Sequence, residues 1–199
     1  MDKKIKALAI GDGVTPTGFS RVMHSIFGRL AEKDYEIHHL AVNYHGDPHD
    51  YKYKIYPAMI GGDVYGIRRL QNFVSLNPDI IFILNDLWVI NEYLKEIRKL
   101  FKNLPKIVVY FPVDAENLDP DWFLNFDIVT QAVVYTEFGQ SCVLDACKNL
   151  NTTIRTRIIT HGVSKETFFK IPKDKKSLKK LIYSDKDEFI DSFIVLSAN

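Results

Sequence analysis

Short apolar runs alternate with amphipathic stretches along most of the chain. Several runs are apolar on both faces and rich in Ile, Val, Leu and aromatic residues, which is typical of strands inside a parallel sheet. The strands predicted in this way cover residues 5–10, 35–42, 53–57, 80–84, 107–111, 132–135 and 155–160. Helical spacing of apolar residues predicts helices over residues 18–31, 64–76, 88–101 and 138–148. This alternation predicts an α/β fold, a Rossmann-like three-layer domain with a mostly parallel sheet.

The loops that follow the strands are where we expect function. Right-handed crossovers place every strand-to-helix loop of such a sheet on one edge. Asn85 and Asp86 follow the strand at 80–84 and are predicted to cap the next helix.

The tail differs from the rest of the chain. Residues 170–180 contain six lysines, Pro172 and few apolar residues, and an apolar run from Phe193 to Ser197 predicts one more strand. We therefore divide the chain into a Rossmann-like domain (1–169), a linker with a short helical segment (170–192), and the first strand of a further domain (193–199) that the chain lacks.

Composition and charge narrow the class of protein. The 199 residues include 26 Lys and Arg against 25 Asp and Glu, and 46% are hydrophobic. This is globular composition, and a net charge of +1 gives no strong field for binding nucleic acid. No run approaches the roughly 20 apolar residues of a membrane span. Cys142 and Cys147 are predicted to be free thiols, and the expected location is the cytoplasm.

The first strand leads into a glycine-rich loop from Gly11 to Gly18. Glycines allow a backbone to approach a ligand closely, and the start of the following helix favours an anion such as phosphate. The spacing matches neither the dinucleotide fingerprint nor a P-loop. We therefore expect Gly13, Thr17 and Gly18 to contact a ligand, the alternative being a plain tight turn.

Polar residues follow two other strands. Asp114 and Glu116 come after the strand at 107–111, where a carboxylate can hold a hydroxyl or take its proton. The alternatives are a turn or cap for Asp114 and a solvated surface position for Glu116. His161 and Gly162 follow the last strand of the first domain, and a structural histidine is the alternative there.

Two further segments carry candidate residues. Gly62 and Asp63 follow the third strand and are predicted to line the same crevice. The stretch from His45 to Asp50 holds two histidines and two carboxylates, but its Gly and Pro favour a polar turn over a metal site. No metal is expected.

Five segments, taken in order, resemble the N-terminal half of a group 1 (family 4) retaining glycosyltransferase with the GT-B fold. The segments are Thr15–Val22, Pro78–Phe82, Tyr110–Asp114, Val134–Gly139 and Ile159–Phe168. The run from Phe193 is similar to the strand that opens the C-terminal domain of that family. The resemblance covers nearly the whole chain.

The resemblance implies an enzyme that moves a sugar from a nucleotide-sugar donor to a glycan or other acceptor in a cleft between two domains. In such enzymes the N-terminal domain recognises the acceptor, its first glycine-rich loop approaches the donor phosphates, and no metal or other cofactor is needed. Asp114 lies where the family keeps an acceptor-side polar residue, which makes it the expected catalytic residue. The C-terminal domain that binds the donor in this family is not part of this chain, so the chain alone is expected to be inactive.

Two alternatives stay open on the sequence. One is a non-enzymatic Rossmann-like module that binds a sugar, a nucleotide or another anion. The other is one subunit of a split glycosyltransferase whose donor domain belongs to a second chain. Peripheral contact with a membrane is also left open.

Overall fold

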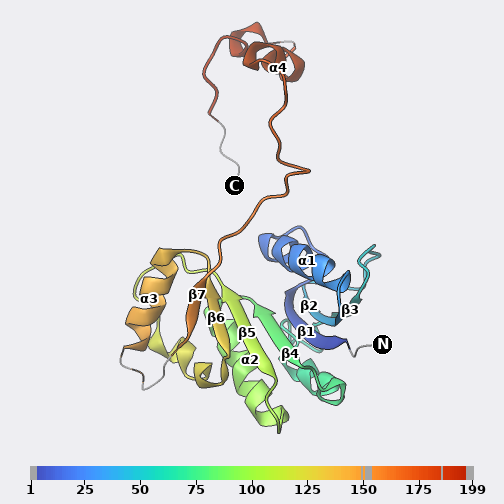
Figure 1. Cartoon of the computed structure of the whole chain (residues 1–199), viewed down its shortest axis with the longest axis vertical. Helices are drawn as coiled ribbons and strands as arrows, with labels where there is room; N and C mark the ends of the chain where they lie inside the picture. Colours follow the sequence, from blue (N-terminus) through green and yellow to red (C-terminus); the bar gives the residue numbers. More distant parts are fainter. Residues whose placement is uncertain (1–3, 149, 151–153, 185, 196–199) are drawn as a thin grey trace. The chain divides into compact units, whose positions relative to one another are not determined.

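The computed structural model describes residues 4–148, 150, 154–184 and 186–195. The chain forms two compact units, Met1–His161 and Gly162–Asn199, which are taken one at a time below (Figure 1).

The first unit is built around a sheet in which each pair of neighbouring strands is parallel. Among the described residues it has seven strands in the order β3-β2-β1-β4-β5-β6-β7. The strands are β1 (Ile5–Asp12), β2 (Tyr35–Val42), β3 (Lys54–Pro57), β4 (Ile80–Leu84), β5 (Lys106–Phe111), β6 (Gln131–Val134) and β7 (Thr156–Ile158). This confirms the predicted α/β class and Rossmann-like layering, and each predicted strand of this unit is present with small shifts at its ends.

Helices cover both faces of the sheet. Helix α1 (Gly18–Ala31) packs on one face and is drawn above β1 and β2 in Figure 1. The opposite face carries α2 (Leu87–Leu100), α3 (Glu137–Cys147) and the 3₁₀ helices η1 (Ile67–Leu76), η2 (Pro120–Phe123) and η3 (Phe126–Ile128). Because β1 is buried on both sides, its alternate residues serve two cores: Leu8 and Ile10 contribute to one, Ala7 and Ala9 to the other.

Helix α3 contains the two cysteines. Both Cys142 and Cys147 are buried free thiols, as predicted. Burial raises the pKa of Cys147 to about 11, so its thiol stays protonated and unreactive at neutral pH.

The segment between β3 and β4 differs from the prediction. An α-helix was expected over residues 64–76, but the segment forms a 3₁₀ helix that begins at Ile67. Core-contacting residues recur every three positions, at Ile67, Leu70, Phe73 and Leu76, with Val74 beside this row. This spacing fits the three residues per turn of a 3₁₀ helix, so one straight stripe faces the sheet.

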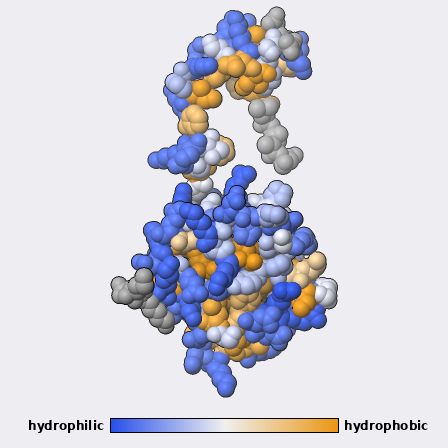
Figure 2. Space-filling model, turned by 90° about the vertical axis from the view of Figure 1, so that its right-hand side faces the viewer, coloured by the Kyte–Doolittle hydropathy of each residue, from blue (hydrophilic) through white to orange (hydrophobic). Residues whose placement is uncertain are grey.

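The second unit contains α4 (Lys175–Ile182) and the 3₁₀ turn η4 (Asp187–Phe189). Asp174 caps α4 by accepting a hydrogen bond from the backbone N–H of Ser177 at 3.0 Å. Apolar side chains remain exposed on this unit, among them Leu181 and Ile182, and Figure 2 shows hydrophobic residues on its surface.

The strand predicted from Phe193 is not formed at residues 193–195, and the rest of that prediction, 196–199, lies outside the described residues. Within the described ranges, no helix has both the length and the apolar character needed to cross a membrane.

Candidate functional site

The order in which strands are added to the sheet reverses between β1 and β4. The chain runs outward from β1 through β2 to β3, then returns to place β4 on the other side of β1. Ligands of open parallel sheets bind in the crevice at such a switch point, outside the carboxyl ends of the strands. Here α1 begins after Thr17 and α2 begins after Asp86, so the N-termini of two helices border the crevice.

Asp12 ends β1 with its side chain largely buried. Its Oδ2 accepts a hydrogen bond from the Thr17 hydroxyl at 2.6 Å, and its Oδ1 accepts one from the Asn43 amide at 3.1 Å. The Thr17 hydroxyl oxygen in turn accepts a hydrogen bond from the N–H of Ser20 at 3.1 Å and so caps α1. One hydroxyl therefore ties the end of β1 to the start of α1.

Close packing around position 13 requires a glycine there. A Cβ at this position would lie 2.5 Å from the Ala41 Cβ and 2.8 Å from the Tyr44 Cβ, which leaves no space for a side chain. Its N–H donates to the carbonyl of Val42 at 2.7 Å, and its own carbonyl accepts from His24 Nε2 at 3.1 Å. Its backbone groups are thus engaged inside the protein, and its predicted contact with a ligand stays a prediction.

The start of α1 offers donors that Gly13 does not. In the part of the chain that the structure describes, the N–H groups of Gly18 and Phe19 make no hydrogen bond. Gly18 is exposed, with no atom within 4 Å of a Cβ built on it. Two free N–H groups at the positive end of a helix dipole form a suitable site for a phosphate or carboxylate.

Two further carboxylates, Asp86 and Asp114, follow β4 and β5 at the same edge of the sheet. Burial raises the pKa of Asp86, and the negative charges of Asp114 and Asp12 raise it further. Asp86 therefore lies within electrostatic range of the carboxylates that end β1 and follow β5. A carboxylate with a raised pKa accepts a proton more readily, so Asp86 is suited to hold a hydroxyl group and take its proton.

Sequence reasoning assigned Asp86 only the role of a helix cap. Asp86 does occupy the N-cap position of α2, but its side chain makes no capping hydrogen bond. Its N–H instead donates to the side chain of Asn85 at 2.9 Å. Its position directly after β4 was the available signal, because that is where the residues of this edge were expected.

Aromatic residues from β5, β6 and β7 meet at the same edge. The Tyr135 ring lies 4.6 Å from that of Tyr110 and 4.2 Å from that of His161. The Tyr110 hydroxyl donates to the carbonyl of Ile159 at 2.8 Å, which holds the end of β7 in place. The Tyr135 hydroxyl is buried and has no hydrogen-bond partner among the described residues, so it is a free donor.

The remaining predicted residues have varied surroundings. Both carboxylate oxygens of Asp63 accept backbone N–H groups, from Gly66 at 2.9 Å and from Arg68 at 2.8 Å, which gives Asp63 a structural role in its turn. Gly62 occupies the left-handed region of that turn, with φ of 84°. Glu116 is exposed in the loop after β5. Gly162 begins the second unit. Their roles at a ligand stay predictions.

Two buried histidines hold the glycine-rich loop by hydrogen bonds to its backbone carbonyls. His24 accepts a hydrogen bond from the Tyr53 hydroxyl at Nδ1 (2.5 Å), and its ring stacks on Tyr51. His39 Nε2 donates to the carbonyl of Gly11 at 3.2 Å. Burial lowers the pKa of both rings, that of His39 to about 3, so both are neutral at pH 7.

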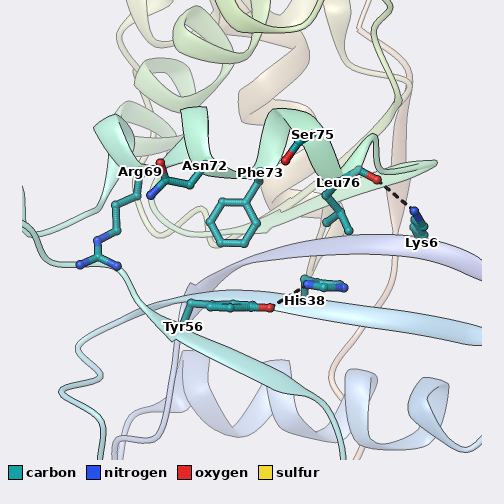
Figure 3. A pocket seen from close by; sticks show the side chains of 8 residues that line it. All are labelled: Lys6, His38, Tyr56, Arg69, Asn72, Phe73, Ser75 and Leu76. Carbon is teal, nitrogen blue, oxygen red and sulfur yellow. Dashed lines mark hydrogen bonds between the residues drawn. The ribbon is translucent and has the colours of Figure 1, made fainter.

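None of the predicted site residues lines the two hollows described for the first unit. One hollow lies between η1 and the strands β1, β2 and β3 (Figure 3). The other lies beside α2 and includes Trp88 and Trp122. Among the described residues, no group of three or more His, Cys, Asp or Glu side chains is placed to hold a metal ion.

No protein-family model matches this chain. No curated protein matches it in sequence either. The residues and geometry of the crevice are therefore the guide to function.

Proposed function

We propose that this chain is the acceptor-side domain of a glycosyltransferase, which moves a sugar from a nucleotide-sugar donor to a hydroxyl group of an acceptor. One juxtaposition carries the proposal. Free N–H groups at the start of α1 and the carboxylates of Asp86 and Asp114 border the same switch point. The N–H groups suit the phosphate group that leaves in sugar transfer, and the carboxylates suit the hydroxyl group that attacks.

The roles follow from the chemistry of each group. The start of α1, at Thr17 and Gly18, approaches the donor phosphates. Asp114 orients the acceptor hydroxyl, and Asp86 is a second acceptor for its proton. The unpartnered Tyr135 hydroxyl and the neighbouring His161 ring provide further contacts for a polyhydroxylated molecule.

The resemblance to the family places the main donor contacts in a further domain. The chain alone is therefore proposed to bind a nucleotide-sugar weakly and to transfer no sugar. The matching binding experiment titrates the ¹⁵N-labelled chain with UDP-glucose or GDP-mannose and follows the amide signals by NMR. The Gly18 and Phe19 amides are expected to shift, whereas that of Gly28, inside α1, stays in place.

The catalytic role is tested in a longer, active version of the protein. Asp114→Ala is expected to lower kcat by about 100-fold or more, the usual range for losing a general base. Its free energy of unfolding should change little, since Asp114 is exposed. Asp145→Ala is the control, because Asp145 lies exposed on α3 in an ion pair with Lys148.

The other outcomes either contradict a part of the proposal or favour a different function. An unchanged kcat in Asp114→Ala contradicts the role of that residue. Transfer by the chain alone contradicts the expected inactivity. Binding of another small anion without any nucleotide-sugar favours a sensing module, and transfer that appears only with a second protein favours a split enzyme.

A further inference from the structure

A hollow of about 390 Å³ lies between η1 and the strands β1, β2 and β3. Figure 3 shows Arg69 at one end of the row of lining side chains and Lys6 at the other, with the rings of Tyr56 and His38 between them. Lys6 precedes Asp12 by six positions on β1, which is roughly 20 Å along a strand. The Lys6 end of the hollow is therefore distant from the crevice at the carboxyl edge.

The two cations of this hollow form no ion pair with any carboxylate in the described part of the chain. Arg69 Nε is buried and has no hydrogen-bond partner among the described residues. Lys6 Nζ donates one hydrogen bond, to the carbonyl of Leu76 at 3.3 Å, and within the same residues no carboxylate lies within 4.0 Å of it. A buried donor without an acceptor is destabilising, and an anionic ligand that accepts its hydrogen bond would remove this cost.

The nearby carboxylates are already engaged. Glu36 accepts a hydrogen bond from His38 Nε2 at 3.0 Å, and this bond is the main cause of its lowered pKa. Asp79 accepts the backbone N–H of Lys6 at 2.8 Å. Neither carboxylate forms an ion pair with Lys6 within 4.0 Å, although the positive charge of Lys6 also lowers the pKa of Glu36 and is partly offset by it. Arg69 is therefore the main cation for a ligand in this hollow.

Flat side chains form the middle of the hollow. The rings of His38 and Tyr56 are nearly parallel, at 5° and 5.8 Å between centroids, and the Tyr56 hydroxyl donates to His38 Nδ1 at 3.0 Å. Phe73 meets the Tyr56 ring edge-on, 5.3 Å between centroids. Such a surface favours a planar or apolar group.

We propose that this hollow is a binding site for a small organic anion, with its carboxylate or phosphate on Arg69 and its planar part against Tyr56 and Phe73. Lys6 offers a second donor at the opposite end. The proposal does not rest on the proposed glycosyltransferase function, because its residues are separate from those at the switch point.

The test uses four probes on the whole chain, followed by calorimetry and amide NMR. Phenyl phosphate and benzoate carry the anionic group and the ring, inorganic phosphate lacks the ring, and benzyl alcohol lacks the charge. One of the two aromatic anions is expected to bind at least tenfold more tightly than either inorganic phosphate or benzyl alcohol, with amide shifts at Arg69 and Tyr56. The tighter of the two identifies phosphate or carboxylate as the natural anionic group.

The Arg69→Gln variant should lose about tenfold to 100-fold in affinity for that probe, the usual effect of losing a hydrogen bond to a charged group. Arg29→Gln is the matched control, since Arg29 is exposed at the end of α1 on the other face of the sheet. Lys6→Gln provides a second variant if Arg69→Gln does not fold. Equal affinity in Arg69→Gln and Arg29→Gln, shifts at other residues, or no binding of either aromatic anion overturns the proposal.

Discussion

Replacing Thr17 with alanine removes a hydroxyl that makes two hydrogen bonds at the start of α1. It donates to Asp12 Oδ2 at 2.6 Å and accepts from the N–H of Ser20 at 3.1 Å. The variant therefore loses a helix cap and also one of the two side-chain partners of a largely buried carboxylate. Asn43 remains as the other partner.

The size of the effect follows from these two losses. A lost N-cap costs about 1 kcal/mol, and a lost hydrogen bond to a charged group about 1.5–3 kcal/mol. The free energy of unfolding should therefore fall by about 2.5–4 kcal/mol in Thr17→Ala. Thr136 caps α3 through the N–H of Gly139 at 3.0 Å. It contacts no carboxylate among the described residues, so Thr136→Ala should cost only about 1 kcal/mol.

Urea unfolding followed by tryptophan fluorescence measures this difference. Both tryptophans, Trp88 and Trp122, belong to the first unit, so the signal reports on the fold that contains Thr17. Thr17→Ser keeps the hydroxyl and should therefore keep most of the stability that Thr17→Ala loses. Equal losses in Thr17→Ala and Thr136→Ala would refute the reasoning, since the bond to Asp12 would then contribute nothing.

Three further predictions concern the loop, the buried histidine and the carboxylates. Measured by urea unfolding, the free energy of unfolding should fall by about 1–3 kcal/mol in Gly13→Ala, because the Cβ position is blocked. In Gly18→Ala, where the Cβ would lie in open space, it should change by less than about 1 kcal/mol. Equal losses in the two variants contradict the packing argument. His39 has its pKa lowered to about 3 in the folded state, so unfolding takes up a proton in acid. Its contribution should fall by about 2 kcal/mol from pH 7 to pH 5, and His39→Gln should remove this part of the pH dependence of unfolding; an unchanged profile argues against it. By carboxyl ¹³C NMR titration, Asp114→Asn should lower the pKa of Asp86, and an unmoved value would show that the two groups do not interact.

Much of the fold could be predicted because local pattern decides it. The ranges of α1 and β2 match the prediction residue for residue, and that of β4 does as well. Two-sided apolar runs specify buried parallel strands, and the Thr17 hydroxyl marks the start of α1. The segment after Gly66 was assigned the wrong helix type, because a stripe of apolar residues does not distinguish three residues per turn from 3.6 when the segment is short.

The sequence predicted where the candidate site lies, but not which side chains contact one another there. Parallel connections put the loops after the strands on one edge, and Asp114 and His161 were expected there for that reason. Asp86 and Tyr135 were missed, because a single position after a strand says nothing of which charges or hydroxyl groups lie across from it. The embedded backbone of Gly13 was hidden in the same way, since Ala41 and Tyr44 approach it from another strand and its following loop.

The sequence by itself determined which segments form strands and which form helices, their order, and the edge where their loops gather, because periodicity and backbone sterics act between near neighbours. Only the tertiary structure decided that β4 lies next to β1, that His39 is neutral in the core, and that Arg69 shares a hollow with Lys6. These features depend on burial and on charges from distant segments, which meet only when the sheet has formed.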